Sequence, residues 1–350
     1  MLAIFLVIEL LIIFYFLAVV CEEFFIDSLD RISKKLKLSS DVAGATFMAA
    51  GSSAPEFFTS LFAVLAITGD RADIGAGTIV GSAIFNILVI IGASAAFKVA
   101  KLQWQPVVRD TLFYCFSIIL LLSAFWDGKV VLFEALSFVA LYGVYILAVV
   151  KWKKIFPYKD VNPIEIVEEQ SEKNLLAKFS RRLLSIVIPD PRKFPKLYLV
   201  TFVMSIVAIS VLSYLLVESG VALAEILGIP PVIVALTILA AGTSVPDLLS
   251  SIVVAKQGRG DMAVSNAVGS NVFDILFGLG APWLFILLWK KEAVPVATEN
   301  LIGSVILLFA TVVAVFFLLI VRKWKIGRRA GFFLIFLYLL YLGYNIINVV

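Results

Sequence analysis

Long apolar segments follow one another along almost the whole of this chain. A membrane-spanning helix needs about 20 predominantly apolar residues. Of the 350 residues, 62% are hydrophobic, whereas a soluble domain is roughly half apolar. The sequence therefore predicts an all-α integral membrane protein. Ten transmembrane helices fit, at residues 3–25, 42–67, 74–97, 107–126, 130–150, 197–217, 231–254, 262–289, 300–321 and 330–349.

The basic residues are unevenly divided between the two sides that ten alternating spans would create. The loops after the odd-numbered spans hold 25 of the 29 Lys and Arg residues, and such residues favour the cytoplasmic side. We therefore expect a plasma-membrane protein with a cytoplasmic linker at residues 151–196 and extracellular termini. The linker separates five spans in residues 1–150 from five in residues 197–350, so that the second half enters the membrane inverted.

Two sequence blocks occur once in each half, in the same order. The first reads TFMAAGSSAPEFFTS at residues 46–60 and TILAAGTSVPDLLSS at residues 237–251. The second reads GTIVGSAIFNIL at residues 77–88 and SNAVGSNVFDIL at residues 265–276. They define an alpha-1 motif at 44–92 and an alpha-2 motif at 235–280, and predict two inverted five-helix repeats.

Each first block places an acidic residue in mid-span, directly after a proline. An unpaired carboxylate in the bilayer costs at least a few kcal/mol, so Glu56 and Asp247 are candidate functional residues. Pro55 and Pro246 lack an N–H and clash with the carbonyl group four residues earlier. The helix should kink or unwind there, and released carbonyl oxygens are tolerated only where they line a cavity or meet a partner. A dehydrated cation is such a partner.

Further oxygen ligands surround these acids in the sequence. Hydroxyls lie three and four residues before each acid, and the second blocks add a serine with Asn86 and a serine with Asp274 at helical spacing. Gly81 and Gly269 would let neighbouring helices approach closely. A lone serine in such a helix usually bonds its own backbone, and Asn86 alone could serve as interhelical glue. The candidate hydroxyl residues are Ser52, Ser53, Thr243, Ser244, Ser82 and Ser270.

The residue types exclude several other kinds of site. The chain contains no His and two Cys, so His-ligated zinc, Ser-His nucleophiles and thiolate clusters are not expected. Carboxylate, amide, hydroxyl and carbonyl oxygens remain, and these suit Ca²⁺, Na⁺ and K⁺.

These motifs resemble the paired alpha repeats of the cation/Ca²⁺ exchanger superfamily, and they are most similar to those of the K⁺-dependent Na⁺/Ca²⁺ exchangers. The resemblance rests on residues 41–56, 242–247, 260–265 and 269–274. It implies that Glu56 and Asp247 are shared by Ca²⁺ and Na⁺, and that spans 1 and 6 slide across a fixed core. It further implies that the hydroxyl residues supply oxygens, with main-chain carbonyls from Ala49 and Ala240, and that Asn86 and Asp274 complete the middle site.

The resemblance also implies the activity: an antiporter that exchanges Na⁺ for Ca²⁺ by alternating access, with K⁺ carried alongside Ca²⁺. Such a protein is not an enzyme, needs no cofactor, nucleic acid or protein partner, and works in the lipid bilayer. A Ca²⁺/H⁺ exchanger, a K⁺-independent exchanger and a passive channel stay open as alternatives. Residues 258–261 fit the GxGD pattern of intramembrane aspartyl proteases, a remote alternative.

One part of the linker has its own pattern. Residues 175–188 carry Leu175, Leu176, Phe179, Leu183, Leu184 and Val187, a spacing typical of an amphipathic helix at a membrane surface.

Overall fold

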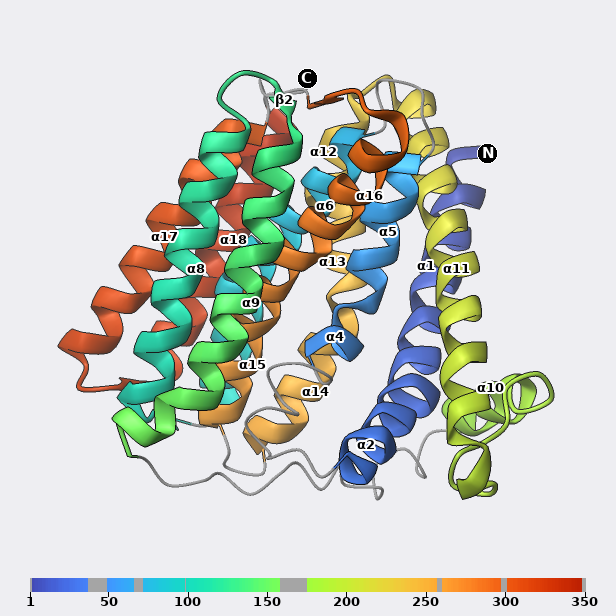
Figure 1. Ribbon diagram of the computed structural model, residues 1–350, viewed down its shortest axis with the longest axis horizontal. Helices are drawn as coiled ribbons and strands as arrows, with labels where there is room; N and C mark the ends of the chain where they lie inside the picture. The colour runs from blue at the N-terminus through green and yellow to red at the C-terminus, as the bar shows by residue number, and fades with distance from the viewer. Residues whose placement is uncertain are drawn as a thin grey trace.

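A computed structural model describes residues 2–36, 49–65, 72–97, 99–157, 175–256, 260–296 and 301–347. It is a bundle of helices that run mostly along one direction (Figure 1). The first helix begins and the last helix ends near the top of Figure 1, whereas α2 (Ile26–Lys35) and α10 (Leu175–Leu184) lie near the bottom. We refer to this lower side as the α2 end.

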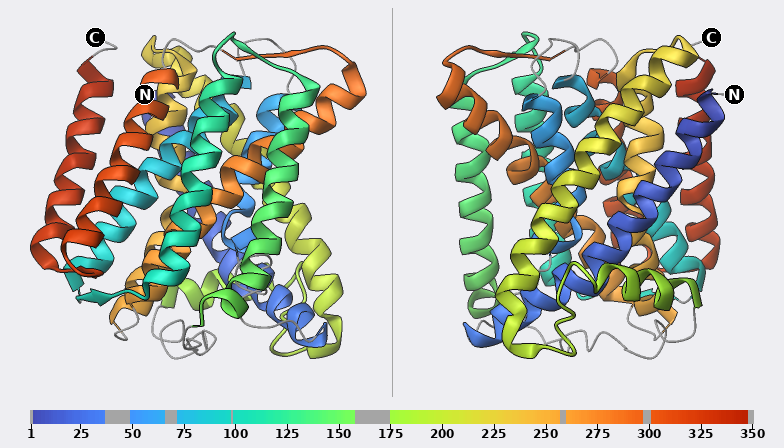
Figure 2. Two further views of the ribbon diagram at one scale, coloured as in Figure 1. Left: turned by 60° about the vertical axis from the view of Figure 1, so that its left-hand side comes forward. Right: turned by 90° about the vertical axis from the view of Figure 1, so that its right-hand side faces the viewer.

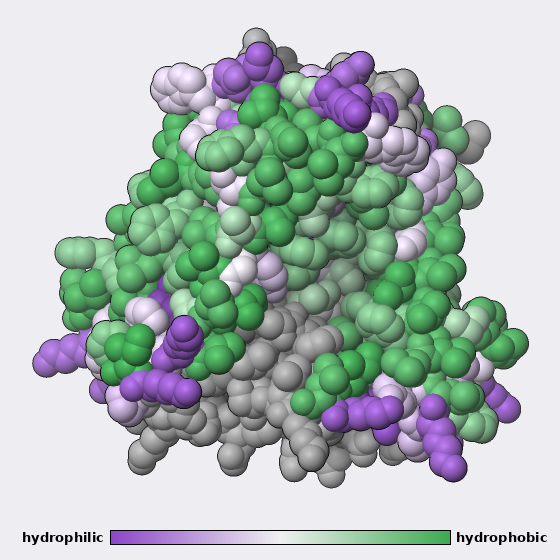
Figure 3. Space-filling model, viewed as in Figure 1, coloured by the Kyte–Doolittle hydropathy of each residue, from purple (hydrophilic) through white to green (hydrophobic). Residues whose placement is uncertain are grey.

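Seven helices among the described residues are long and apolar enough to cross a membrane. They coincide with seven of the ten predicted spans and occupy Leu2–Leu29, Asp73–Phe97, Trp104–Ala124, Leu132–Trp152, Pro195–Leu227, Ala263–Lys290 and Leu301–Val321. Predicted spans 42–67 and 231–254 contain shorter apolar helices, and 330–349 contains α18 (Arg328–Ile347). Figure 3 shows a broad hydrophobic belt between hydrophilic residues at the top and bottom, as expected for a chain solvated by lipid.

The outer helices are continuous. Two of them, α1 (Leu2–Val20) and α11 (Tyr198–Leu227), cross in front of the other helices in the right-hand view of Figure 2. α1 continues through the π-helical turn η1 (Cys21–Phe25) into α2. The remaining outer helices are α8 (Trp104–Ala124), α9 (Leu132–Ile155), α17 (Leu301–Val321) and α18, and the short η5 (Pro195–Leu197) precedes α11.

The two inner helices that carry the first sequence block are broken at equivalent residues. Ser53 separates α4 (Ala49–Ser52) from α5 (Ala54–Leu65), and Ser244 separates α13 (Ala240–Thr243) from α14 (Val245–Lys256). In both copies the break lies two residues before the proline, because proline cannot continue the helical hydrogen bonds. The predicted interruption is therefore confirmed. α12 (Pro231–Val234) and the π-helical η6 (Ala235–Leu239) lead into α13.

The two helices that carry the second block share another irregularity. α6 (Ala72–Phe85) passes into the π-helical η3 (Asn86–Ile90) and then α7 (Ile91–Phe97). α15 (Gly260–Phe273) likewise passes into η7 (Asp274–Leu279) and α16 (Gly280–Lys290). The π-helical turns begin at Asn86 and Asp274, the equivalent candidate residues of the two motifs. Turns of this kind are rare and often occur at functional sites.

Close packing of the inner helices depends on one of the two predicted glycines. A Cβ atom at Gly81 would overlap the carbonyl oxygen of Leu236, so that α6 and η6 are in backbone contact there. The same expectation for Gly269 is wrong. A Cβ atom there would meet only the Tyr145 hydroxyl, at 3.8 Å, which is ordinary contact. The close approach is therefore a property of the α6–η6 pair.

Two short antiparallel pairs join loops that are far apart in the sequence. β1 (Ala100–Lys101) pairs with β4 (Lys325–Ile326), and β2 (Lys129–Val130) pairs with β3 (Val294–Pro295). The first pair joins two loops that we predict to be cytoplasmic, and the second joins two that we predict to be extracellular. Each pairing therefore agrees with the alternation of the spans.

Candidate functional site

The carboxylates of Glu56 and Asp247 lie in the middle of the bundle, just beyond the two helix breaks. Glu56 is 1% exposed and Asp247 is 2% exposed. Each is in the first turn of the helix that restarts after its break. The two acids are close enough to repel each other electrostatically. Two buried carboxylates in a membrane protein must be neutralised, by a bound cation or by a proton.

In each motif, a serine donates a hydrogen bond to the acidic residue of the other motif. The Ser244 hydroxyl donates a hydrogen bond of 3.3 Å to Oε1 of Glu56, and the Ser52 hydroxyl donates one to the Asp247 carboxylate. Ser244 belongs to the second motif and Ser52 to the first, so these contacts cross between the halves. The two breaks therefore face one another across a single polar centre.

The second blocks add an amide layer beside this centre. Nδ2 of Asn86 donates to Oδ1 of Asn271 at 2.8 Å and lies 3.5 Å from the Ser270 hydroxyl. Asn271 in turn donates to the Tyr114 hydroxyl at 2.9 Å and to the Ala83 carbonyl at 3.2 Å. These contacts fix the amide group of Asn86 with its donor turned towards Asn271. Its acceptor, Oδ1, is buried without a hydrogen-bond partner among the described residues.

Several other oxygens near the centre are also buried and lack a hydrogen-bond partner in the described part of the chain. They are Oε2 of Glu56, one carboxylate oxygen of Asp274, and the hydroxyls of Thr59, Ser60 and Ser251. Buried polar atoms are nearly always bonded, so this set points to a missing partner. A hard cation bound by oxygens fits such acceptors.

The three acids are not arranged as a single tight cluster. Within the described ranges, no three acidic, His or Cys side chains lie close enough together to hold one metal ion between them. Asp274, which is 1% exposed, lies within electrostatic range of Glu56 and Asp247. Amide, hydroxyl and carbonyl oxygens near Glu56 and Asp247 are therefore further candidate ligands for a cation held by these acids.

The remaining predicted ligands are placed less distinctively. The hydroxyls of Ser82, Ser270 and Thr243 donate to carbonyls of their own helices. The Ala240 carbonyl accepts from the Ser244 N–H and the Thr243 hydroxyl, each at 3.3 Å. Ala49 is the first residue of α4. Residues 41–48 of the resembling segment and residues 258–259 of the GxGD pattern lie outside the described residues.

Asn271 is the clearest residue that the sequence reasoning missed. It is fully buried and joins Asn86 to Tyr114. Its counterpart in the first motif is Ala83, so a comparison of the two motifs did not identify Asn271 as a candidate residue. Ser60 and Ser251, which do match between the copies, could have been found from the repeat.

Comparisons with known proteins agree with the motifs. The family described as "Sodium/calcium exchanger protein" matches residues 6–151 and 197–347. Human sodium/potassium/calcium exchanger 5 is 33% identical and human sodium/potassium/calcium exchanger 4 is 30% identical. The alignments cover 94% and 95% of this chain, and 81% and 79% of the relatives. These relatives are named as exchangers, so the chain is similar to transporters and not to enzymes.

Solved structures share the fold. The sodium–calcium exchanger NCX_Mj, soaked with 2.5 mM Na⁺ and 10 mM Sr²⁺, superimposes with a TM-score of 0.60 at 23% identity, over 97% of this chain and 99% of that one. The H⁺/Ca²⁺ exchanger CAX superimposes with a TM-score of 0.69 at 18% identity, over 93% and 79%. The family match covers both halves and the human relatives align along nearly the whole sequence, and on these grounds the chain belongs to the sodium/calcium exchanger protein family.

Proposed function

We propose that this chain is a secondary active antiporter that exchanges Na⁺ for Ca²⁺ by alternating access, with K⁺ carried alongside Ca²⁺. The observation that carries the proposal is the crossed bonding of Glu56 by Ser244 and of Asp247 by Ser52. One buried polar centre is thereby shared by two copies of one motif. In the arrangement that we propose, ten spans form two inverted five-helix repeats around this centre.

Charge balance gives the coupling. Glu56 and Asp247 together carry two negative charges, which one Ca²⁺ or several Na⁺ can neutralise. An uncompensated pair of carboxylates crosses a low-dielectric barrier only at high cost. The cation-loaded centre therefore changes its exposure and the empty centre does not, which makes exchange obligatory.

The ligand set combines these acids with neutral oxygens. We assign Glu56 and Asp247 to both Ca²⁺ and Na⁺. Asn86 contributes its amide oxygen, and Asp274 adds a third negative charge that K⁺ balances when Ca²⁺ is bound. Further oxygens come from Ser52, Ser53, Ser82, Thr243, Ser244 and Ser270, and from the main chain at Ala49 and Ala240.

The moving part is the pair α1 and α11. These helices pack against each other, α11 also packs against α5 and α12, and α1 also touches α13 and α14. They therefore lie directly against both broken helices. A shift of the pair would open the centre to one side at a time, with residues 151–196 on the cytoplasmic side and the termini outside the plasma membrane.

The coupling ions are tested by ⁴⁵Ca²⁺ uptake into proteoliposomes loaded with Na⁺, at clamped voltage, with external K⁺ or a large organic cation. We expect uptake that needs internal Na⁺ and increases with K⁺. Uptake that needs Na⁺ but ignores K⁺ would remove K⁺ from the proposal. Uptake driven by a pH gradient without Na⁺ would favour Ca²⁺/H⁺ exchange, and flux without any counter-ion would indicate a channel.

A further inference from the structure

The segment from Leu175 to Phe194 lies against both helices of the α1–α11 pair. In the right-hand view of Figure 2, α10 runs crosswise to α1 and α11 at the α2 end. Its Ser180 hydroxyl, which is 4% exposed, forms a hydrogen bond of 3.0 Å with the Tyr15 hydroxyl of α1. The Thr201 hydroxyl of α11 donates to the Pro189 carbonyl at 2.8 Å. One segment thus contacts both helices, and we call residues 175–194 the strap.

Ion pairs fix the strap to the extension of α1. Arg181 donates two hydrogen bonds to Asp190, at 2.9 and 2.8 Å, and its other nitrogen lies 3.6 Å from Glu23. Arg192 lies 3.2 Å from Glu23 and 3.7 Å from Asp27. Two guanidinium groups therefore join the strap to η1 and α2. These ion pairs are only partly exposed, and contacts between charged groups of this kind are stronger than contacts between neutral groups.

Asp190 accepts the hydrogen bonds that hold the strap in its conformation. It is 3% exposed, and burial alone would raise its pKa. Hydrogen bonds from the Arg181 side chain and the Arg192 backbone N–H outweigh burial and hold the pKa of Asp190 below the usual value of 3.8. The carboxylate therefore stays charged at neutral pH, and the strap keeps its shape.

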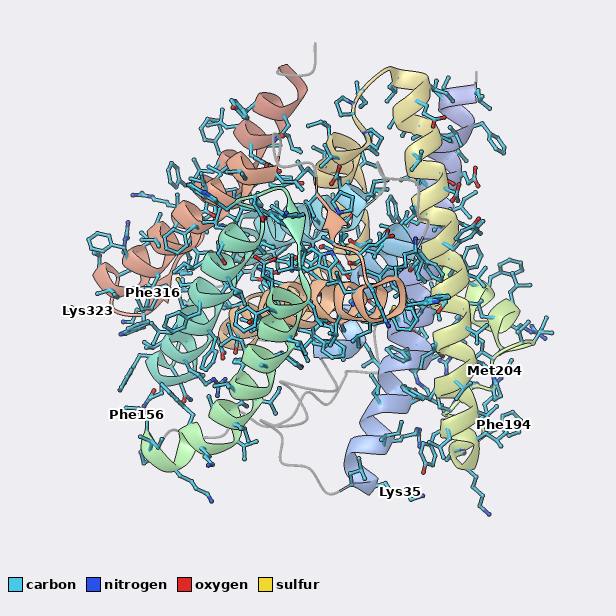
Figure 4. The ribbon with its side chains drawn as sticks, turned by 45° about the horizontal axis from the view of Figure 1, so that its top comes forward. Lys35, Phe156, Phe194, Met204, Phe316 and Lys323 are labelled. Atoms are coloured by element: carbon cyan, nitrogen blue, oxygen red, sulfur yellow. The ribbon has the colours of Figure 1, made fainter. Side chains whose placement is uncertain are left out.

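The foot of α11 is joined to α2 as well. Lys35 donates a hydrogen bond of 2.8 Å to the Tyr198 hydroxyl, and its ammonium group also lies 5.4 Å from the ring centre. Figure 4 shows Lys35 at the end of α2 and Phe194 before α11 on the same side of the molecule. The strap and this contact together tie α1, α2 and α11 into one unit.

The opposite face of the strap is apolar and uncovered by any described residue. Phe179, Leu183, Ile186 and Val187 are 68%, 47%, 79% and 65% exposed. Phe179 and Leu183 lie one turn apart on α10, Ile186 and Val187 lie in the turn that follows the helix, and Lys178 and Arg182 are exposed beside them. If this face were in water, four large apolar side chains would be exposed to solvent. At a membrane surface the apolar groups enter the lipid and the basic groups reach the headgroups.

The basic residues of the strap indicate which lipid headgroups it would bind. Lys178 and Arg182 are attracted to anionic headgroups, and the apolar residues Leu199, Val200 and Val203 at the start of α11 are exposed as well. We propose that the strap docks on an anionic lipid surface and thereby holds α1 and α11 together at the α2 end. The docking is independent of the proposed function, whereas its effect on transport rests on that function.

Docking is measured by spin labels on the full-length protein in nanodiscs. Phe179→Cys and Ile186→Cys are labelled in a Cys115→Ala background, with Lys193→Cys as an exposed control, while the fully buried Cys21 stays in place. We expect labels at 179 and 186 to be more accessible to oxygen than to a water-soluble nickel chelate, increasingly so as anionic lipid replaces phosphatidylcholine. Equal access to the chelate at all three positions would overturn the proposal.

The anionic partner is tested by charge removal. Lys178→Gln/Arg182→Gln should abolish the dependence of label depth on anionic lipid. The matched variant Arg322→Gln/Lys323→Gln, at exposed residues away from the strap, should preserve it. A strap variant that responds like the unmodified protein would exclude anionic lipid as the partner.

Ca²⁺ uptake in the same lipids separates this proposal from the proposed function. We expect uptake to increase with anionic lipid in the unmodified protein and to lose that dependence in Lys178→Gln/Arg182→Gln. Docked labels with no Na⁺-driven uptake would contradict the exchange function alone. Normal uptake with labels exposed to water would contradict the strap alone.

Discussion

Asp274 and Asn86 are equivalent residues of the two motifs, yet one is charged and the other is neutral. Both are buried at the first residue of a π-helical turn, and each has an oxygen without a hydrogen-bond partner among the described residues. The third carboxylate therefore comes from one half only. In the function that we propose, this asymmetry distinguishes a monovalent ion from Ca²⁺, because Glu56 and Asp247 together balance a divalent charge.

Asp274→Asn should remove most of the K⁺ stimulation of Ca²⁺ uptake while changing the Ca²⁺ affinity less, because it removes the charge that K⁺ balances. Ca²⁺ titrations of uptake with and without K⁺ give both quantities. A variant that is still fully stimulated by K⁺ would exclude Asp274 from that role.

Tyr114→Phe should weaken apparent Ca²⁺ affinity about 2- to 10-fold, since one buried hydrogen bond contributes about 0.5–1.5 kcal/mol. The change removes the hydroxyl that orients Asn271 and, through it, the amide of Asn86. The same titration on Tyr344→Phe, at a residue that is 66% exposed, is the control. Equal affinity in the two variants would show that the amide layer does not orient a ligand.

At the scale of helices, the two prolines were sufficient to predict where the inner helices break. Pro55 and Pro246 cannot continue the hydrogen-bonding pattern, and the helices break two residues before each. The π-helical turns at Asn86 and Asp274 were not predicted, because one extra residue in a turn leaves no mark on apolar periodicity. Gly81 was identified correctly and Gly269 was not, since a glycine alone does not show which neighbour lies beside it.

Gly81→Ala should lower the free energy of unfolding by about 1–3 kcal/mol, the usual cost of overpacking. The new Cβ would meet the Leu236 carbonyl, which is backbone and cannot rotate away. Thermal unfolding in detergent, compared with Gly143→Ala, measures the change. A Cβ at Gly143 has no neighbour within 4 Å, so the two variants should differ, and equal melting temperatures would argue against close α6–η6 contact.

At the scale of the whole molecule, the strand pairs assign four loops to two opposite ends. The distribution of Lys and Arg predicted these assignments, and the pairing of β1 with β4 and of β2 with β3 agrees with them. The contacts of the strap could not be predicted in the same way. Glu23 lies near the end of the predicted span 3–25 and Arg181 lies in the predicted linker, and nothing in the sequence relates the two positions.

The orientation in the membrane is tested by labelling cells with a membrane-impermeant maleimide, in the Cys115→Ala background. Asp127→Cys, in the loop before β2, should react from outside, whereas Lys323→Cys, before β4, should react only after permeabilisation. The reverse pattern would invert the topology. Labelling of both from one side would contradict the alternation of the spans.

The central claim is that Glu56 and Asp247 together hold the transported Ca²⁺. The most direct test is Na⁺-driven ⁴⁵Ca²⁺ uptake by Glu56→Gln and by Asp247→Asn in proteoliposomes, beside Glu292→Gln, which alters an exposed acid in the loop before β3. We predict that each of the first two variants loses uptake and that Glu292→Gln retains it. Uptake at the unmodified rate by Glu56→Gln or Asp247→Asn would contradict the account.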